Sequence, residues 1–168
     1  LDDAFARGAP VTAPVDSLIE RTPGLRAYLE TREETVTALV REVRAASRCP
    51  IRTIHLGAWH STGGNTRALA QESESIDVLA YTSVAEQVRR TARSVLEEMG
   101  PEASPDRLLV GLQAYPPHAT SAEVLVANVR AALELGVRRF SFYNYGIMPL
   151  PCLGWVAQAV RVIRTAEP

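Results

Sequence analysis

Two kinds of hydrophobic pattern alternate between residues 107 and 146. Residues 107–115 and 137–146 are short apolar runs typical of strands, whereas residues 121–135 carry apolar side chains at helical spacing. This pattern predicts a strand–helix–strand unit whose strands run parallel through a right-handed crossover. Functional residues should lie where the strands end, because parallel strands bring their C-terminal ends to one edge of a sheet.

The same alternation extends over most of the chain and predicts its fold class. Helical spacing over 22–49 is followed by apolar runs at 52–60 and 76–82, each with a helical segment after it, and a last helix covers 153–163. The strands begin about 25–30 residues apart, which is the repeat of a (β/α)8 barrel of about 250 residues. We therefore expect an α/β fold, half of a (β/α)8 (TIM) barrel, with four parallel strand–helix units preceded by a long helix.

Residues 1–21 are expected to be a loosely structured lead-in to a single domain over residues 22–168. A half-barrel sheet has two unpaired edges, which natural proteins avoid. Either a missing N-terminal half-barrel or a second copy of this chain would pair them. A small open sheet is the remaining alternative.

Strand alternation sorts the side chains by face. We expect the more apolar set of each strand to face the helices and the polar or small set to face the barrel interior. In the second strand the interior set is Asp77, Leu79 and Tyr81. The helix-facing residues expected in the other strands are Ile54, Leu56 and Ala58, then Val110, Leu112 and Ala114, and finally Phe140 and Phe142.

An aromatic residue stands near the C-terminal end of each expected strand, namely Trp59, Tyr81, Tyr115 and Tyr145. Aromatic rings with polar groups suit a sugar, whose surface carries both C–H patches and hydroxyls. Ordinary strand packing explains such aromatics equally well. His118 lies in a loop that could reach the same place, whereas His55 lies deeper. The candidate substrate-binding residues are Trp59, His60, Tyr81, Gln113, Tyr115, Tyr143, Asn144 and Tyr145.

A second motif follows the first strand and offers a different chemistry. The stretch HSTGGNT resembles the phosphate loop of flavodoxins, in which hydroxyls and backbone amides before a helix hold the phosphate of flavin mononucleotide (FMN). A glycine-rich turn at a barrel mouth is the simpler interpretation. The residues of the FMN alternative are Ser61, Thr62, Gly63, Asn65 and Thr66.

Composition narrows the classes of function. The chain has 168 residues, 46% of them hydrophobic, and a net charge of -1, so it lacks the basic excess typical of nucleic-acid binding. Its two cysteines and three histidines have no metal-ligand spacing, and no membrane span is expected. All 18 basic residues are arginine, which excludes a phosphate-loop, Schiff-base or pyridoxal-phosphate lysine. No cofactor is expected apart from the FMN alternative, and a reducing cytoplasm is the default compartment.

The chain resembles the C-terminal half of a glycoside-hydrolase-type (β/α)8 barrel, as found in bacterial glycosidases of unassigned specificity. The segments that carry this resemblance are LRAYLETREETVTALVREV, DVLAYT, VGLQAY, GVRRFSFYNYG and LGWVAQAV. The resemblance implies a hydrolase with a carbohydrate ligand.

Such hydrolases need two carboxylates that flank the scissile bond. In many of these families the nucleophile ends the seventh strand, and the matching position here, near Gln113 to Tyr115, carries no acid. Asp77 stands near the start of its strand, where a salt bridge or a cap at the barrel bottom is expected rather than catalysis. The catalytic residues are therefore unknown: they belong to a missing half, the chemistry differs, or the protein only binds sugar.

Overall fold

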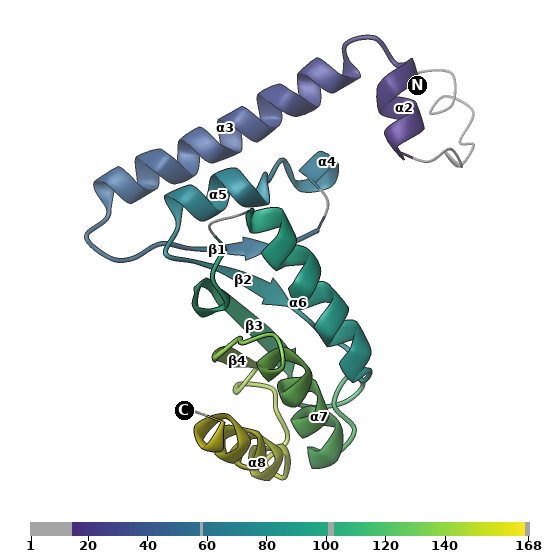
Figure 1. The fold of residues 1–168 in the computed structure, drawn as a ribbon, viewed down its shortest axis with the longest axis vertical. Helices are drawn as coiled ribbons and strands as arrows, with labels where there is room; N and C mark the ends of the chain where they lie inside the picture. The colour runs from purple at the N-terminus through teal and green to yellow at the C-terminus, as the bar shows by residue number, and fades with distance from the viewer. Residues whose placement is uncertain (1–14, 58, 101–102, 167–168) are drawn as a thin grey trace.

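A parallel sheet with helices between its strands forms the body of the protein (Figure 1). The computed structural model describes residues 15–57, 59–100 and 103–166. The elements are α2 (Val15–Arg21), α3 (Leu25–Ala46), β1 (Arg52–His55), α4 (Trp59–Thr62), α5 (Thr66–Glu72), β2 (Ser75–Leu79), α6 (Ala85–Met99), the 3-10 turn η1 (Pro105–Arg107), β3 (Leu108–Gln113), α7 (Ala122–Leu133), β4 (Arg139–Tyr143) and α8 (Cys152–Thr165).

The four strands lie in the order β1-β2-β3-β4, and each is parallel to the next. One lateral row of paired residues runs from Ile54 through Asp77 and Leu109 to Arg139. Sequential order with a helix in every crossover is the arrangement of half of a (β/α)8 barrel. The predicted α/β fold of four strand–helix units after a long helix is confirmed.

One face of the sheet is covered by helices and contains the core. Val78, Val110 and Leu112 are almost fully buried there, because alternation places them on the side of α6 and α7. The helices contribute apolar side chains at helical spacing, so the two sets interdigitate away from water. The buried helix residues at this contact are Val88, Ala92, Val95, Leu125, Val129 and Ala132.

The other face of the sheet is not covered by helices within the described part of the chain, although Leu109 in its middle is only 6% exposed. Leu79 is 39% exposed and Tyr143 is 45% exposed on this side. Phe140 and Phe142 pack against the core instead. The predicted face assignment is therefore confirmed for β2, β3 and β4.

The face assignment for β1 was wrong. Ile54 is 52% exposed because it pairs with Asp77 and follows it onto the uncovered face. His55 lies on the helix side, where its Nε2 is 3.2 Å from Oε2 of Glu98 in α6. The strand ends at His55, so Leu56 is exposed beyond the sheet, and Ala58 lies outside the described residues. The prediction placed the more apolar side chains of β1 against the helices. In this short edge strand the apolar Ile54 is exposed instead.

The predicted loose lead-in is helical over Val15–Arg21, which form α2, and residues 1–14 lie outside the described residues. Ile19 of α2 is buried. Helix α3 begins after Gly24, whose φ of 78° is a left-handed conformation that glycine adopts without strain. The part of the expected lead-in that the structure describes is therefore helical rather than loose.

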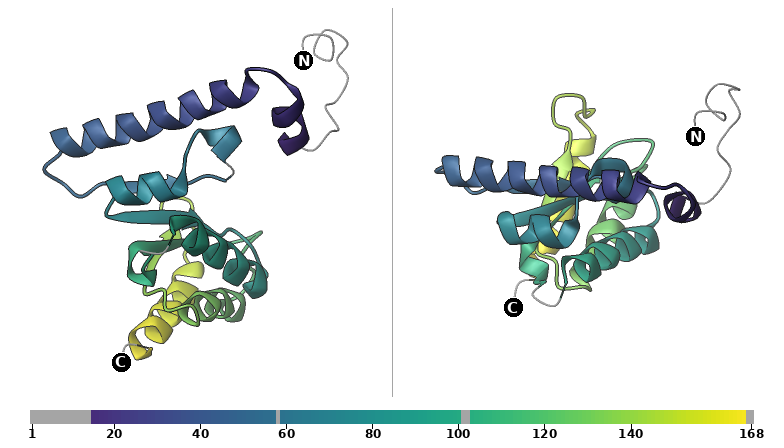
Figure 2. Two further views of the ribbon diagram at one scale, coloured as in Figure 1. Left: turned by 45° about the horizontal axis from the view of Figure 1, so that its top comes forward. Right: turned by 90° about the horizontal axis from the view of Figure 1, so that it is seen from above.

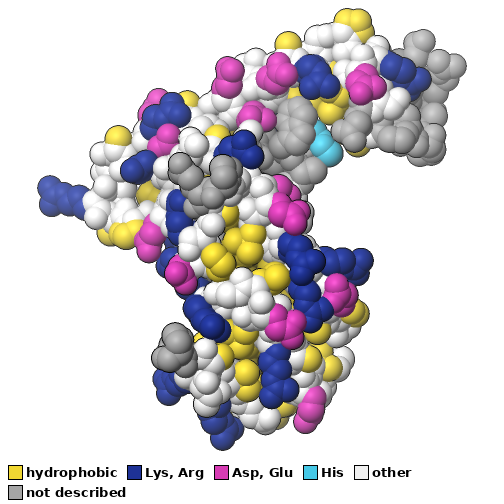
Figure 3. All heavy atoms as spheres, viewed as in Figure 1, with side chains coloured by type: hydrophobic (Ala, Val, Ile, Leu, Met, Phe, Trp, Pro, Cys, Tyr) yellow, Lys and Arg dark blue, Asp and Glu magenta, His cyan; other side chains and the backbone are white. Residues whose placement is uncertain are grey.

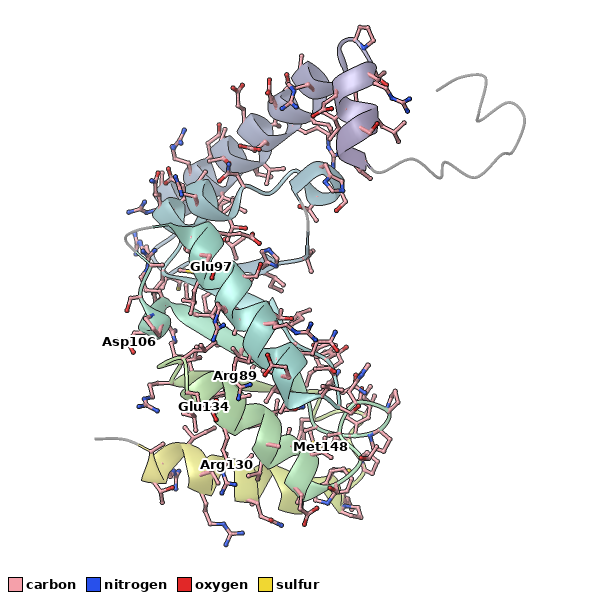
Figure 4. All side chains as sticks on the ribbon, turned by 45° about the vertical axis from the view of Figure 1, so that its right-hand side comes forward. Arg89, Glu97, Asp106, Arg130, Glu134 and Met148 are labelled. Carbon is pink, nitrogen blue, oxygen red and sulfur yellow. The ribbon has the colours of Figure 1, made fainter. Side chains whose placement is uncertain are left out.

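The helices α3, α5, α6, α7 and α8 follow one another from the top to the bottom of Figure 1, and further views of the same series are given in Figure 2. At one end, Nη1 of Arg44 in α3 is 3.1 Å from Oε2 of Glu72 in α5. Between α6 and the end of α7, Nη2 of Arg89 is 2.5 Å from Oε2 of Glu134 (Figure 4). Ion pairs therefore link neighbouring helices along the series.

Arginine and acidic side chains are interspersed over the face drawn in Figure 3, without a single-sign patch. None of the helices in the described ranges is long and apolar enough to cross a membrane.

Candidate functional site

A hollow of about 260 Å³ lies on the uncovered face of the sheet. It extends toward the C-terminal ends of the strands, which is where (β/α) folds place their sites. Its polar lining comes from side chains that alternate away from the helices. The lining residues are Ile54, Asp77, Leu79, Tyr81, Ser141, Phe142, Tyr143 and Asn144.

Tyr81 is the centre of an aromatic cluster at this end of the sheet. Its ring stacks on that of Tyr143, with ring centroids 5.4 Å apart and an interplanar angle of 28°. The ring of His118 is tilted by 33° to it at a centroid distance of 6.2 Å. These residues come from the ends of β2 and β4 and from the loop after β3, so the cluster depends on the sheet order.

The phenol of Tyr81 is harder to ionise than that of an ordinary tyrosine. Burial raises the pKa of Tyr81 above its ordinary value, and the phenols of Tyr143 and Tyr115 raise it further. At neutral pH the hydroxyl of Tyr81, like that of any tyrosine, is a hydrogen-bond donor suited to a ligand oxygen. The contribution of Tyr115 also shows that this phenol belongs to the same electrostatic environment.

Two amide side chains hold the loops that follow β3 and β4. Nε2 of Gln113 donates to the carbonyl oxygens of Tyr115 (3.3 Å) and Pro116 (3.2 Å). Oδ1 of Asn144 accepts from the backbone amide of Gly146 at 2.8 Å. Both residues were predicted as direct ligand contacts. Asn144 lines the hollow, whereas Gln113 is not among its lining residues and its amide is bonded within the loop after β3.

The structure does not bring every predicted site residue to the cluster. Tyr145 is 79% exposed and lies beyond the end of β4, so Tyr143 takes the place predicted for it. Trp59 was predicted at the end of β1 but belongs to α4, and its side chain lies outside the described residues. His60 is also in α4, where its carbonyl oxygen accepts from Arg32 of α3. The short length of β1 explains the positions of Trp59 and His60, and the end of β4 at Tyr143 explains that of Tyr145.

Asp77 is a site residue whose setting the sequence indicated only in part. The predicted salt bridge forms, with Oδ2 of Asp77 3.8 Å from Nη1 of Arg52. The same carboxyl group lines the hollow. Burial raises the pKa of Asp77 above its ordinary value, while Arg52 opposes that shift. Its place in the hollow follows from the alternation that also placed Leu79 and Tyr81 on this face.

As pH rises, the free energy of unfolding of Asp77→Asn should exceed that of the parent chain by a growing amount. A raised folded-state pKa means that protonation of Asp77 favours the folded state, and this contribution is lost as pH rises from the ordinary aspartate pKa of 3.8 through the raised pKa. The asparagine variant does not titrate there, so urea unfolding at several values between pH 3 and 7 should show a growing difference in its favour. The opposite slope would show that the contact with Arg52 outweighs burial.

No family model matches the chain, and no curated protein or solved structure matches it either. The assignment of a function therefore depends on the geometry of the site. Within the described residues, no group of three or more histidine, cysteine, aspartate or glutamate side chains could hold a metal ion.

The FMN alternative can be compared with the geometry of its loop. Nδ2 of Asn65 is 2.7 Å from Oε1 of Glu33, and Oγ1 of Thr66 is 2.8 Å from Oε2 of Glu98. Oγ1 of Thr62 accepts from a backbone amide of the same loop. Two carboxylates thus contact the loop and would repel a phosphate. The sheet order also lacks the reversal at which flavodoxins bind FMN.

Proposed function

We propose that the cluster around Tyr81 is half of a carbohydrate-binding site in a glycosidase-like barrel. The observation that carries this proposal is the stack of Tyr81 on Tyr143, with His118 beside it, at the C-terminal ends of parallel strands on an uncovered face. Stacked tyrosines offer flat apolar rings to the C–H face of a sugar, and their hydroxyls can bond to its oxygens.

The size of the hollow supports a half-site. Pockets for whole small-molecule ligands measure about 300–1,000 Å³, so a hollow of about 260 Å³ is smaller than a complete site. Its lining combines aromatic, hydroxyl and amide groups, a mixture that matches a sugar better than a purely apolar ligand. The remaining wall would have to come from outside the described residues.

The available carboxylates favour binding over hydrolysis by this chain. Asp77 is the acid in the lining of the hollow, and it stands in the middle of β2 rather than at its end. Glycoside hydrolysis needs two carboxyl groups, about 5–9.5 Å apart depending on the mechanism. A sugar-binding half-barrel without activity of its own is therefore the form of the proposal that these residues support. The FMN alternative is not carried forward, because acids contact its loop.

The proposal is tested by titrating the chain with hexasaccharides of glucose, xylose, mannose and N-acetylglucosamine, followed by tyrosine fluorescence and calorimetry. We expect at least one of them to bind. Tyr143→Ala should then weaken binding by about 1–3 kcal/mol, or about 5- to 150-fold, because it removes an exposed stacking face.

Tyr28→Ala is the matched control, because Tyr28 is an exposed tyrosine on α3 that does not line the hollow. Thermal melts of both variants separate loss of binding from loss of fold. If none of the four sugars binds, or if Tyr28→Ala weakens binding as much as Tyr143→Ala, the carbohydrate proposal is wrong.

A further inference from the structure

We infer that the uncovered sheet face and the edges of β1 and β4 dock a complementary half-barrel of four parallel strands and three helices, which precedes this half in the same polypeptide. The inference does not depend on the proposed ligand. It rests on the number of helices around the sheet, on the path of α3 and on the charges at the two edges.

The helix count distinguishes this partner from a second copy. A complete barrel has eight strands and one helix for each gap between strands. Besides the short helices α2 and α4, this chain already places five helices around its four strands, with α5, α6 and α7 in the inner crossovers and α3 and α8 at the two ends of the series (Figure 1). Four strands and three helices therefore remain to be supplied. A second copy would bring α3 and α8 into the same gap at each seam.

Helix α3 has the position of a crossover helix that arrives from an earlier strand. It runs antiparallel to β1, since Arg32 near its start bonds to His60 after β1, and Arg44 near its end bonds to Glu72 before β2. Its C-terminus leads directly into β1, so its N-terminus lies at the end of the sheet where a preceding parallel strand would finish. The complementary half is therefore placed upstream on the chain.

The charges at the two edges also disfavour a second copy. Arg52 begins β1 and Arg139 begins β4, and alternation and strand pairing place both on the uncovered face. Arg52 has Asp77 (3.8 Å) and Arg139 has Glu74 (3.5 Å) as acidic partners within the chain. In a symmetric dimer β4 would pair with β1 of the other copy, which would bring Arg139 close to Arg52 at both seams. Like charges on adjacent strands are destabilising.

The face itself has the apolar residues that such a partner would bury. Ile54 is 52% exposed on β1, Leu79 is 39% exposed on β2, and Tyr143 is 45% exposed on β4. Three large apolar side chains across one sheet face, next to two unpaired edges, form a surface that soluble proteins normally cover.

The test uses the coding sequence that immediately precedes codon 1. We expect it to encode, in frame, four strand–helix patterns. The encoded segment, coexpressed with this chain as a separate polypeptide, should form a 1:1 complex detectable by native mass spectrometry. Leu79→Asp and Ile54→Asp should each reduce the amount of complex at least tenfold, since they put a charge into the buried face.

Val84→Asp is the control, because Val84 is an exposed apolar residue at the start of α6 and does not line the hollow. It should leave the complex intact, and circular dichroism should show that all three variants are folded. Three outcomes would overturn the inference: an upstream sequence without such units, a complex that tolerates both Leu79→Asp and Ile54→Asp, or a symmetric dimer of this chain alone in which Leu79 is protected.

Discussion

Leu112→Ala should lower the free energy of unfolding by about 2–5 kcal/mol, the cost of truncating a buried leucine in a packed core. Leu112 is 1% exposed in the central strand β3 and packs among the core side chains under α6 and α7. The loss combines the transfer energy of the removed methyl groups with the cavity that remains. Urea unfolding followed by circular dichroism measures it directly.

Leu79→Ala is the matched comparison, since it makes the same chemical change on the neighbouring strand but on the uncovered face. Leu79 is 39% exposed, so we expect a loss below about 1 kcal/mol in this chain. In a completed barrel the same residue would be buried, and the cost should rise toward that of Leu112→Ala. Equal losses in this chain alone would contradict the assignment of faces in β2 and β3.

Arg107→Ala should lower the free energy of unfolding by about 2–4 kcal/mol, because it removes charge-assisted hydrogen bonds to part-buried carbonyl groups. Nη2 of Arg107 donates to the carbonyl oxygens of Ala70 and, at 2.8 Å, Ser73, and its Nε donates to that of Glu74 at 3.3 Å. These carbonyls belong to the end of α5 and the turn into β2. The guanidinium therefore ties the start of β3 to the preceding unit.

Arg107→Lys tests whether the planar guanidinium group is needed for this stabilisation, because a lysine offers one compact charge and cannot reach several carbonyls in the same geometry. We expect it to recover less than half of the loss. Arg138→Ala, at an exposed arginine, should change stability by less than about 0.5 kcal/mol. If Arg107→Ala unfolds at the same urea concentration as the parent, the hydrogen bonds contribute nothing net.

The face assignments separate what alternation can predict from what it cannot. In β3, Val110, Leu112 and Ala114 face the helices as expected, because period-two alternation in a central strand leaves one self-consistent choice. In β1, Ile54 is the more apolar residue and yet is exposed, because its pairing with Asp77 decides its face. Pairing between strands is not written in the local pattern of either strand.

In the aromatic cluster, too, alternation predicts some positions, and the tertiary structure decides the others. Alternation puts Tyr143 and Tyr145 on one face, but the sheet ladder ends at Tyr143, whose carbonyl oxygen accepts from Ala114, and Tyr145 lies beyond it in solvent. His118 reaches Tyr81 because the loop after β3 folds back over the strand ends. Nothing in the spacing of these residues specifies that path.

The sequence by itself determined the α/β class, the four strand–helix units and their parallel order, because periodicity and spacing are local properties that the chain carries in any state. The tertiary structure alone decided which aromatic residues meet, which face of β1 is covered and how Asp77 is buried. These depend on the register between strands and on the paths of loops, which are set by the packing of segments far apart in the chain.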